Sequence, residues 1–281
     1  MPVKIIADST CDLPKEMLEE HRISIVPLTV SLGKRSGHDG VEITPEDIYE
    51  YVEKSGKLPQ TAAVSVWEFV QEFRKWRDEG CDIVCFTISS SLSSSYQNAV
   101  IAGDEVGSVF VIDSRNLSLG VGMLALHAAK LAEAGKSAEE IVISVGDLIT
   151  KMEVSFVPST IEYLKKGGRC SALAALGANL FKIRPCIEVE MGNLTVGKKY
   201  RGSTEKILKT YLEERLKDRR DIDTDQIFVV HTKCEQALVD EMMTAVRTYL
   251  PDVKQVVEAV AGSTITTHCG PGTFSLMFAR K

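Results

Sequence analysis

The stretch Cys81–Ala99, CDIVCFTISSSLSSSYQNA, contains the features from which the fold can be predicted. It begins with an almost wholly apolar segment at residues 81–88, of the kind that forms a strand buried on both faces of a sheet. A turn rich in serine follows at residues 89–95, and a helical pattern runs from Leu92 to Ala102. The stretch therefore predicts a strand, a hydroxyl-rich turn and a helix, in that order.

The same alternation of strand and helix extends on both sides of this stretch. A helix is predicted before it at residues 65–80, a second buried strand follows it at residues 108–113, and the apolar run at residues 3–7 predicts the first strand. Alternating strands and helices are typical of a parallel sheet with helices on both faces. We therefore predict an N-terminal α/β domain with three layers over residues 1–160.

The second half of the chain has a different pattern. Residues 185–201 alternate around Gly192-Asn193, as in a β-hairpin, and helices and strands then follow one another to the glycine-rich C-terminal region. We expect a second α/β domain with a mixed sheet over residues 161–281.

Composition and charge narrow the possible functions. The chain has 281 residues, with 33 basic and 39 acidic side chains and a net charge of −6, which argues against non-specific binding of nucleic acid. No run approaches the roughly 20 apolar residues that span a membrane, and the N-terminal segment is unlike a secretory signal. Seven cysteines without a CxxC pair predict reduced thiols. We expect a cytoplasmic protein without stable membrane insertion.

Hydroxyl-rich turns follow three predicted strands, at residues 8–10, 89–95 and 113–114, and a fourth polar turn containing Thr61 precedes a helix. Ligands of open parallel sheets bind beyond the carboxyl ends of the strands, and hydroxyls at a helix start favour an anion. The serine turn could also be a single N-cap serine beside a solvated loop. The convergence of several such turns favours an anion-binding site.

Three common catalytic patterns are absent from the sequence. It has no GxxxxGK[ST] loop for nucleotide phosphates, no GxGxxG after the first strand and no GxSxG nucleophile turn. Four of the five histidines lack the spacing of metal ligands: His21, His38, His127 and His231. We therefore expect no metal and no cofactor.

Two residues near glycines are candidates for binding a carboxylate or a phosphate. His268 lies in THCGPGT, where glycines and proline predict an unusual loop backbone, and it could bond either to an anion or to a loop carbonyl. Arg169 follows Gly167-Gly168, where a close approach is possible, and it could bind an anion or lie in solvent after a helix end.

A basic cluster at Lys198, Lys199 and Arg201 stands out in this acidic chain. It could face an acidic partner, although such clusters are usually solvated.

Several of these motifs, taken together and in order, resemble the DegV family over essentially the whole chain: DST after the first strand, SSSLSSSYQNA, IEYLKKGGRCS, RPCIEV, YRG and THCGPGT. The resemblance implies two α/β domains with a long-chain fatty acid, such as palmitate or oleate, held in an internal tunnel. It also implies a non-catalytic role, as the fatty-acid-binding subunit of a bacterial fatty-acid kinase. That subunit presents the carboxylate to a separate ATP-dependent kinase, which forms an acyl phosphate.

The resemblance also implies roles for particular residues. Thr61 and Ser93 would bind the carboxylate, with His268 in support, and Arg169 and Arg201 would lie at the site mouth or dock the partner. The first domain would hold the head group, and the second would contribute to the tunnel and its mouth. The chain reads TAAVS where members often read TSQPS, and SSLSSSY where they often read SGLSGTY, but it keeps the threonine and the serine.

Two alternatives stay open. One is a phosphotransferase-like enzyme related to dihydroxyacetone kinase, against which the missing nucleotide motif counts. The other is a carrier of a different lipid with a carboxyl or phosphate head.

Overall fold

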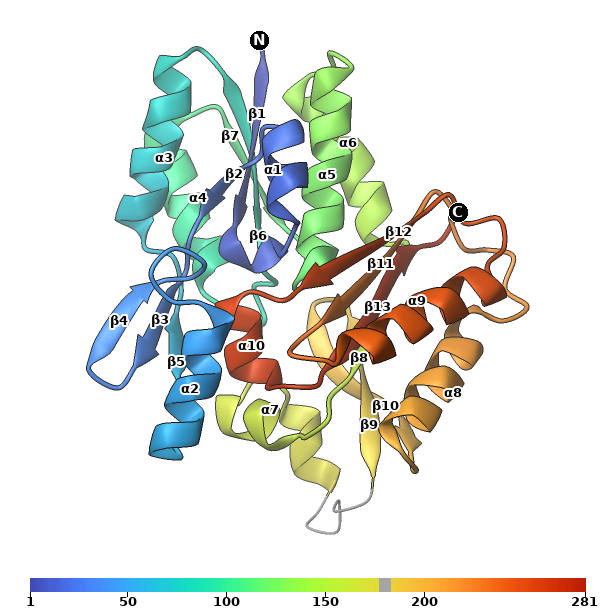
Figure 1. Ribbon diagram of the computed structural model, residues 1–281. Coiled ribbons are helices and arrows are strands. Elements are labelled where there is room, and N and C mark those ends of the chain that lie inside the picture. Colours follow the sequence, from blue (N-terminus) through green and yellow to red (C-terminus); the bar gives the residue numbers. More distant parts are fainter. Residues whose placement is uncertain (177–182) are drawn as a thin grey trace. The chain divides into compact units, whose positions relative to one another are not determined.

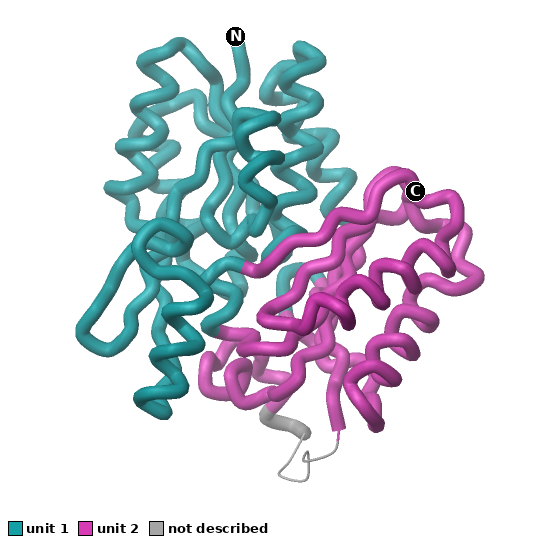
Figure 2. Tube along the Cα trace, in the orientation of Figure 1, with its two compact units in different colours: residues 1–150, 191–193, 262–267 teal, residues 151–190, 194–261, 268–281 magenta. Residues whose placement is uncertain are grey.

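The computed structural model describes residues 1–176 and 183–281. It divides into two compact units (Figure 2). Unit 1 comprises Met1–Thr150, Met191–Asn193 and Gly262–Thr267, and unit 2 comprises Lys151–Glu190, Leu194–Ala261 and His268–Lys281. Unit 1 contains a parallel sheet and unit 2 a separate mixed sheet, so the predicted fold class is confirmed.

The central sheet of unit 1 is parallel throughout and has the strand order β2-β1-β6-β7 (Figure 1). Its strands are β1 (Val3–Asp8), β2 (Ser24–Val26), β6 (Asp82–Thr87) and β7 (Val109–Asp113). The prediction of a second fully buried strand at 108–113 is wrong, because β7 lies at the edge of the sheet and all its residues are partly exposed.

Helices cover both faces of this sheet. The side chains of α3 and α4 pack with Ile83 and Cys85 in one core cluster, whereas α5 and α6 contact the strands from the other side. Helix α5 is buried over most of its circumference, and Gly122 allows it to approach the backbone of Cys11. The helices that surround this sheet are α1 (Lys15–Glu20), α3 (Val66–Asp78), α4 (Ser95–Val106), α5 (Leu119–Glu133) and α6 (Ala138–Ile149).

A small antiparallel sheet with the order β4-β3-β5 completes unit 1 beside helix α2 (Pro45–Ser55). Its strands are β3 (Thr29–Leu32), β4 (Arg35–His38) and β5 (Gln60–Ala62). Helix α2 begins at a Thr44 capping box and ends at Gly56, whose φ is +67°.

The sheet of unit 2 is mixed, with the order β10-β9-β8-β13-β11-β12. Strand β13 runs antiparallel to both β8 and β11, whereas β11 and β12 are parallel. The strands are β8 (Met152–Val157), β9 (Arg184–Glu190), β10 (Asn193–Tyr200), β11 (Gln226–His231), β12 (Gln255–Val260) and β13 (Phe274–Ala279). The predicted hairpin around Gly192 corresponds to β9 and β10.

Helices α8 (Thr204–Leu216) and α9 (Gln236–Tyr249) pack on this sheet, and α7 (Glu162–Gly167) follows β8. Short helical segments complete the chain: η1 (Ser9–Cys11), η2 (Ser171–Leu176) and α10 (Ser263–Cys269).

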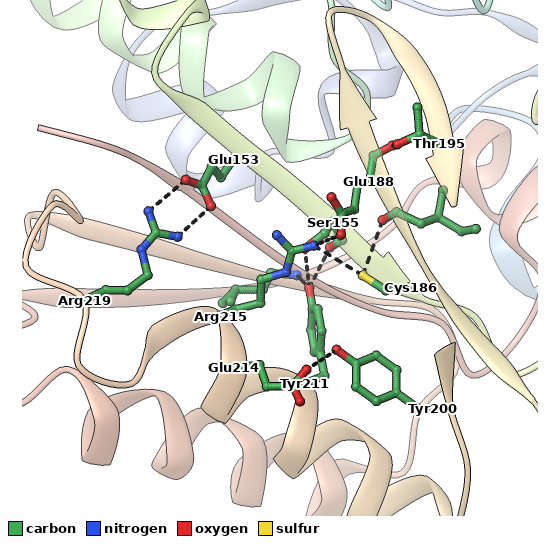
Figure 3. Close-up of polar contacts among 12 residues, drawn as sticks. Glu153, Ser155, Cys186, Glu188, Thr195, Tyr200, Tyr211, Glu214, Arg215 and Arg219 are labelled. Atoms are coloured by element: carbon green, nitrogen blue, oxygen red, sulfur yellow. Dashed lines mark hydrogen bonds and ion pairs between the residues drawn. The ribbon is translucent and has the colours of Figure 1, made fainter. Parts of the chain in front are cut away.

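A buried polar network joins α8 to the sheet of unit 2 (Figure 3). The fully buried Tyr211 hydroxyl donates to the Ser155 carbonyl at 2.9 Å and accepts from the Leu276 amide at 3.2 Å. Beside it, Arg215 of α8 donates both to the Cys186 sulfur, at 3.6 Å, and to the Glu188 carboxylate. These bonds fix β9, and with it the hairpin, to α8.

Candidate functional site

The carboxyl end of β1 is bonded to the start of the serine turn through Asp8. Its Oδ2 accepts from the Ile88 amide at 2.8 Å, and its Oδ1 accepts from the Thr10 hydroxyl at 2.5 Å. Asp8 is fully buried, and burial raises its pKa to about 6 against the opposing effect of these hydrogen bonds. The first two hydroxyl-rich turns therefore meet at one carboxylate, as expected for neighbouring parallel strands.

The first serines of the turn at 89–95 are bonded to other parts of unit 1. The Ser89 hydroxyl donates to the Gly192 carbonyl at 2.8 Å, and the Ser90 hydroxyl and amide donate to Asp113 at 2.5 and 3.1 Å. Gly192 is required here, because a Cβ at that position would lie 2.5 Å from the Ser89 hydroxyl. Ser89 and Ser90 are thus bonded to other segments of unit 1, whereas Ser91 and Ser94 are exposed.

Ser93 lies at the end of this turn, beside the first residue of α4. Its hydroxyl accepts from the Ser95 amide at 3.2 Å and lies 3.0 Å from the Ser95 hydroxyl. The prediction that this helix begins at Leu92 is wrong: α4 begins at Ser95, because the residues before it form a turn in which the Leu92 and Ser93 amides donate to the Ser89 carbonyl.

Thr61 lies in the middle of β5, paired with Val30 and partly buried. The turn that follows Thr61 is bonded to α4: the Val64 amide donates to the Ser95 hydroxyl at 3.4 Å, and Asn98 Nδ2 donates to the Val64 carbonyl at 2.7 Å. The structure therefore brings the Thr61 turn and Ser93 into one hydrogen-bonded cluster.

A third element of unit 1, the first turn of α10, is held by Asp39. The Asp39 Oδ1 accepts from the Ser263 amide at 2.8 Å, and Oδ2 accepts from the Thr264 amide at 3.2 Å and from the Ser9 hydroxyl at 2.9 Å. The sequence carries no signal for this role of Asp39, because the glycines on either side of it in GHDG are typical of a simple turn.

Asp12 is the second carboxylate at this helix. Its Oδ1 accepts from the Gly262 amide at 2.9 Å, and its Oδ2 accepts from the Ser118 hydroxyl at 2.5 Å. Burial raises the pKa of Asp12 to about 8, and the charge of nearby Asp39 adds to the shift. Its separation of 250 residues from Gly262 gives the sequence no local signal for the contact.

His268 lies in the last turn of α10, and the prediction that it belongs to a glycine-rich loop is wrong. The helix forms despite its β-branched residues because Asp12 and Asp39 bind its first amides. In unit 2 the imidazole packs on Gly167, where a Cβ would lie 2.6 Å from its Nδ1. Burial and, secondarily, the charge of Arg169 lower the pKa of His268 to about 4, so the ring is neutral near pH 7.

The glycine-rich loop itself begins after α10, at Gly270. The φ of Gly270 is +70°, and a Cβ there would lie 2.5 Å from the Tyr163 ring. Its carbonyl accepts from the Thr232 hydroxyl at 2.5 Å, and the Pro271 carbonyl accepts from Ser159 at 2.5 Å. The loop after His268 is therefore fixed within unit 2.

Both candidate arginines are exposed residues of unit 2. Arg169 Nη1 donates to the Gly167 carbonyl at 2.7 Å, which places it in the same segment as the glycine that contacts His268. Arg201 directly follows β10, and the neighbouring Lys198 forms an ion pair with Glu214.

The five candidates thus form two groups. The cluster that contains Ser93 and the Thr61 turn belongs to unit 1, whereas His268, Arg169 and Arg201 belong to unit 2. Hydroxyls and a neutral imidazole can hydrogen-bond to a carboxylate without forming a strong ion pair. Within residues 1–176 and 183–281, no group of three or more His, Cys, Asp or Glu side chains is placed to hold a metal ion. In the same part of the chain, no helix is long and apolar enough to cross a membrane.

Comparison with known proteins shows similarity along the whole chain. The model of the DegV family matches residues 2–281. A DegV domain-containing protein of Caldanaerobacter subterraneus subsp. tengcongensis is 32% identical over 99% of both chains. A protein of Thermotoga maritima named as a fatty acid-binding protein is 32% identical over 97% of this chain and 96% of its own length.

Solved structures also resemble this chain along nearly its whole length. A DegV family protein of Thermus thermophilus, described for its fatty acid binding, superposes with a TM-score of 0.88 at 28% identity and full coverage of both chains. A stearic acid-binding protein of Eubacterium ventriosum has a TM-score of 0.86 at 29% identity and covers 99% of this chain and 98% of its own. Since the family model and the relatives match nearly every residue, this chain belongs to the DegV family.

Proposed function

We propose that this protein binds a long-chain fatty acid and presents its carboxylate to a separate ATP-dependent kinase, which forms an acyl phosphate. The carboxylate ligands are Thr61 and Ser93, with His268 as a supporting residue. The observation that carries the proposal is the cluster in which Val64, Ser95 and Asn98 bond the Thr61 turn to the turn that ends at Ser93. The names of the Thermotoga and Eubacterium relatives support the choice of ligand.

The binding free energy expected for a fatty acid is consistent with hydroxyls and a neutral imidazole as the ligands of its carboxylate. Each buried methylene of an acyl chain contributes about 0.8 kcal/mol, so most of the affinity comes from the chain. Neutral donors orient the head group, and a fatty-acid carboxylate is already ionised near pH 7 and needs no base. In this proposal the carrier itself therefore has no catalytic residue. It acts in the cytoplasm, where ATP is available to the kinase.

The binding step is tested by extracting lipid from the purified protein and identifying it by mass spectrometry, followed by titration with palmitate and oleate. We expect a fatty acid to co-purify. A protein that carries no lipid and binds neither added acid would contradict the proposal, and ATP turnover by the pure chain that is lost on His268→Ala would favour the phosphotransferase alternative.

Arg201→Ala tests the presentation step, and Arg169→Ala tests it at a second exposed arginine. Arg201 is exposed and follows a basic strand end on an acidic protein, which suits it to a partner better than to a buried head group. We expect fatty-acid affinity to stay the same and acyl-phosphate formation with the cognate kinase to fall. Exposed Arg247 of α9 supplies the control, Arg247→Ala. Loss of lipid binding with unchanged kinase affinity would reverse the assignment.

A further inference from the structure

Two threonines of α10 carry buried hydroxyls that the fold of unit 1 does not use. Thr264 is 3% exposed and Thr267 is 2% exposed. Neither Oγ1 has a hydrogen-bond partner among the described residues. A buried polar atom is nearly always hydrogen-bonded in a native protein, so an unpartnered hydroxyl points to a group from outside the chain.

Three other helical threonines of this protein form a hydrogen bond within their own helix. The hydroxyls of Thr210, Thr244 and Thr248 each donate to the carbonyl four residues earlier, at 2.9 Å in all three cases. That local bond is the usual solution for threonine inside a helix. Thr267 does not adopt it, although Ser263 lies four residues earlier in the same helix and Thr267 is more deeply buried than these three residues. Thr264 is the second residue of α10 and has no helical residue four positions earlier.

The orientation of α10 is fixed by contacts that leave these hydroxyls out. The amides of Gly262, Ser263 and Thr264 are bound by Asp12 and Asp39, and the Ser263 hydroxyl donates to the Ile43 carbonyl at 2.7 Å. The amides at the helix start are therefore already occupied, and a ligand could not use them as its anion site.

The two hydroxyls are neighbours on one face of the helix. Positions three residues apart are adjacent on a helical surface, so Thr264 and Thr267 can address one ligand group together. His268 directly follows Thr267. It is four positions after Thr264, and it therefore lies on the same face of the helix as Thr264.

We propose that Thr264 and Thr267 form a hydrogen-bonding site for an acceptor oxygen of the bound lipid. The inference rests on the proposed function and adds two ligand residues to it. A plain hydrocarbon segment against this face would leave both donors unpaired, at a cost that an oxygen would remove. The oxygen is either that of the carboxylate or that of a hydroxylated acyl chain, since both present the same acceptor chemistry.

The test uses the delipidated full-length protein with two ligands of equal chain length, stearate and 10-hydroxystearate. The variants are Thr264→Val, Thr267→Val and the double variant, because valine has nearly the shape of threonine without its hydroxyl. Thr248→Val on α9 is the matched control, and Thr264→Ser and Thr267→Ser are the rescue variants. Dissociation constants and the melting temperature of the ligand-free protein are measured for each.

We expect each valine substitution to weaken binding about tenfold, and serine to restore it. Equal losses for both ligands assign the threonines to the carboxylate, whereas a loss for hydroxystearate alone assigns them to a chain oxygen. The ligand-free variants should melt at the same or a higher temperature, because an unpaired buried hydroxyl has been removed. That combination separates a ligand contact from a purely structural role.

Unchanged affinity for both ligands in the double variant would overturn the inference, as would a fall in melting temperature that accounts for the weaker binding. This result is distinct from failure of the proposed function, in which the wild-type protein binds neither stearate nor hydroxystearate.

Discussion

Asp39 and Ser263 lie 224 residues apart in the sequence, yet the carboxylate of the first accepts from the amide of the second at 2.8 Å. The same carboxylate binds the Thr264 amide and the Ser9 hydroxyl. Asp39 therefore caps α10 from a distant part of unit 1, and it fixes the helix that carries Thr264 and Thr267.

Asp39→Ala should destabilise the protein by about 3–5 kcal/mol, because three donors lose their acceptor at a buried site. Urea denaturation gives the free energy of unfolding. Asp104→Ala, at an exposed position of α4, is the control and should change it by less than about 0.5 kcal/mol. A loss below about 1 kcal/mol in Asp39→Ala would mean that α10 is held by other contacts.

Asp12 should make stability depend on pH. Its pKa is raised from 3.8 to about 8 in the folded protein, so the folded state binds its proton more tightly than the unfolded state does. The stability from this group is complete below pH 4, falls as pH rises and is lost once pH passes about 8. Between pH 6.5 and 8 the loss should approach about 1 kcal/mol per pH unit.

Asp12→Asn removes this titration and can keep both hydrogen bonds, with its carbonyl accepting from Gly262 and its amide donating to Ser118. Asp8 has largely titrated by pH 6.5, whereas His268, whose pKa falls from 6.5 to about 4 on folding, still makes stability rise with pH at the lower end of the window. Both proteins share that contribution, so the difference between their free energies of unfolding, measured by urea denaturation from pH 6.5 to 8, should report Asp12 alone. Parallel curves for the two proteins would refute the prediction.

Gly167→Ala tests the packing of His268. The new Cβ would lie 2.6 Å from His268 Nδ1, so the imidazole has to move, and we expect a loss of about 1–3 kcal/mol. The matched control is Gly146→Ala in α6, where no heavy atom lies within 4 Å of the position that the added methyl group would take. That variant should gain about 0.5–1 kcal/mol from the better helix propensity of alanine. Equal changes in the free energy of unfolding for the two substitutions would show that the His268 side chain can move aside without a cost in stability.

The alternation of strands and helices was sufficient to predict the parallel sheet, because the centres of β1 and β6, at residues 5–7 and 83–86, are contiguous apolar runs. The ends of α2 at Thr44 and Gly56 were also predictable, because both capping signals lie next to the helix in the sequence. Strands β3 and β5 were harder: each is at most four residues long, and the pairing of Val30 with Thr61 joins distant segments.

The candidate site was predictable only in part. Thr61 and Ser93 were identified from motifs, but the bonds that join Val64, three residues after Thr61, to Ser95 and Ser95 to Ser93 depend on folding. Helix α10 escaped prediction because its caps come from Asp12 and Asp39, far away in the chain, and because the sequence STITTHC favours an extended backbone.

Thr61→Val and Ser93→Ala test the carboxylate ligands directly. A hydrogen bond from a neutral hydroxyl to a charged oxygen contributes about 1.5–3 kcal/mol, so each substitution should weaken fatty-acid binding by roughly tenfold to a hundredfold. Binding should not vanish, because the acyl chain still contributes most of the affinity. Acyl-phosphate formation with the kinase should fall further than binding, because a carboxylate that is no longer held is poorly aimed at the phosphoryl donor.

The two variants should differ in stability as well as in binding. The Ser93 hydroxyl accepts from the Ser95 amide at the start of α4, so Ser93→Ala should cost about 1 kcal/mol of folding free energy. Thr244→Val, at an exposed helical position of unit 2, is the control for loss of a threonine hydroxyl. A fatty-acid titration and a coupled kinase assay are compared with urea denaturation of the same samples. If both variants bind and support acyl-phosphate formation like the wild type, the head group lies elsewhere, since removing a hydroxyl that binds the carboxylate has to weaken binding or acyl-phosphate formation.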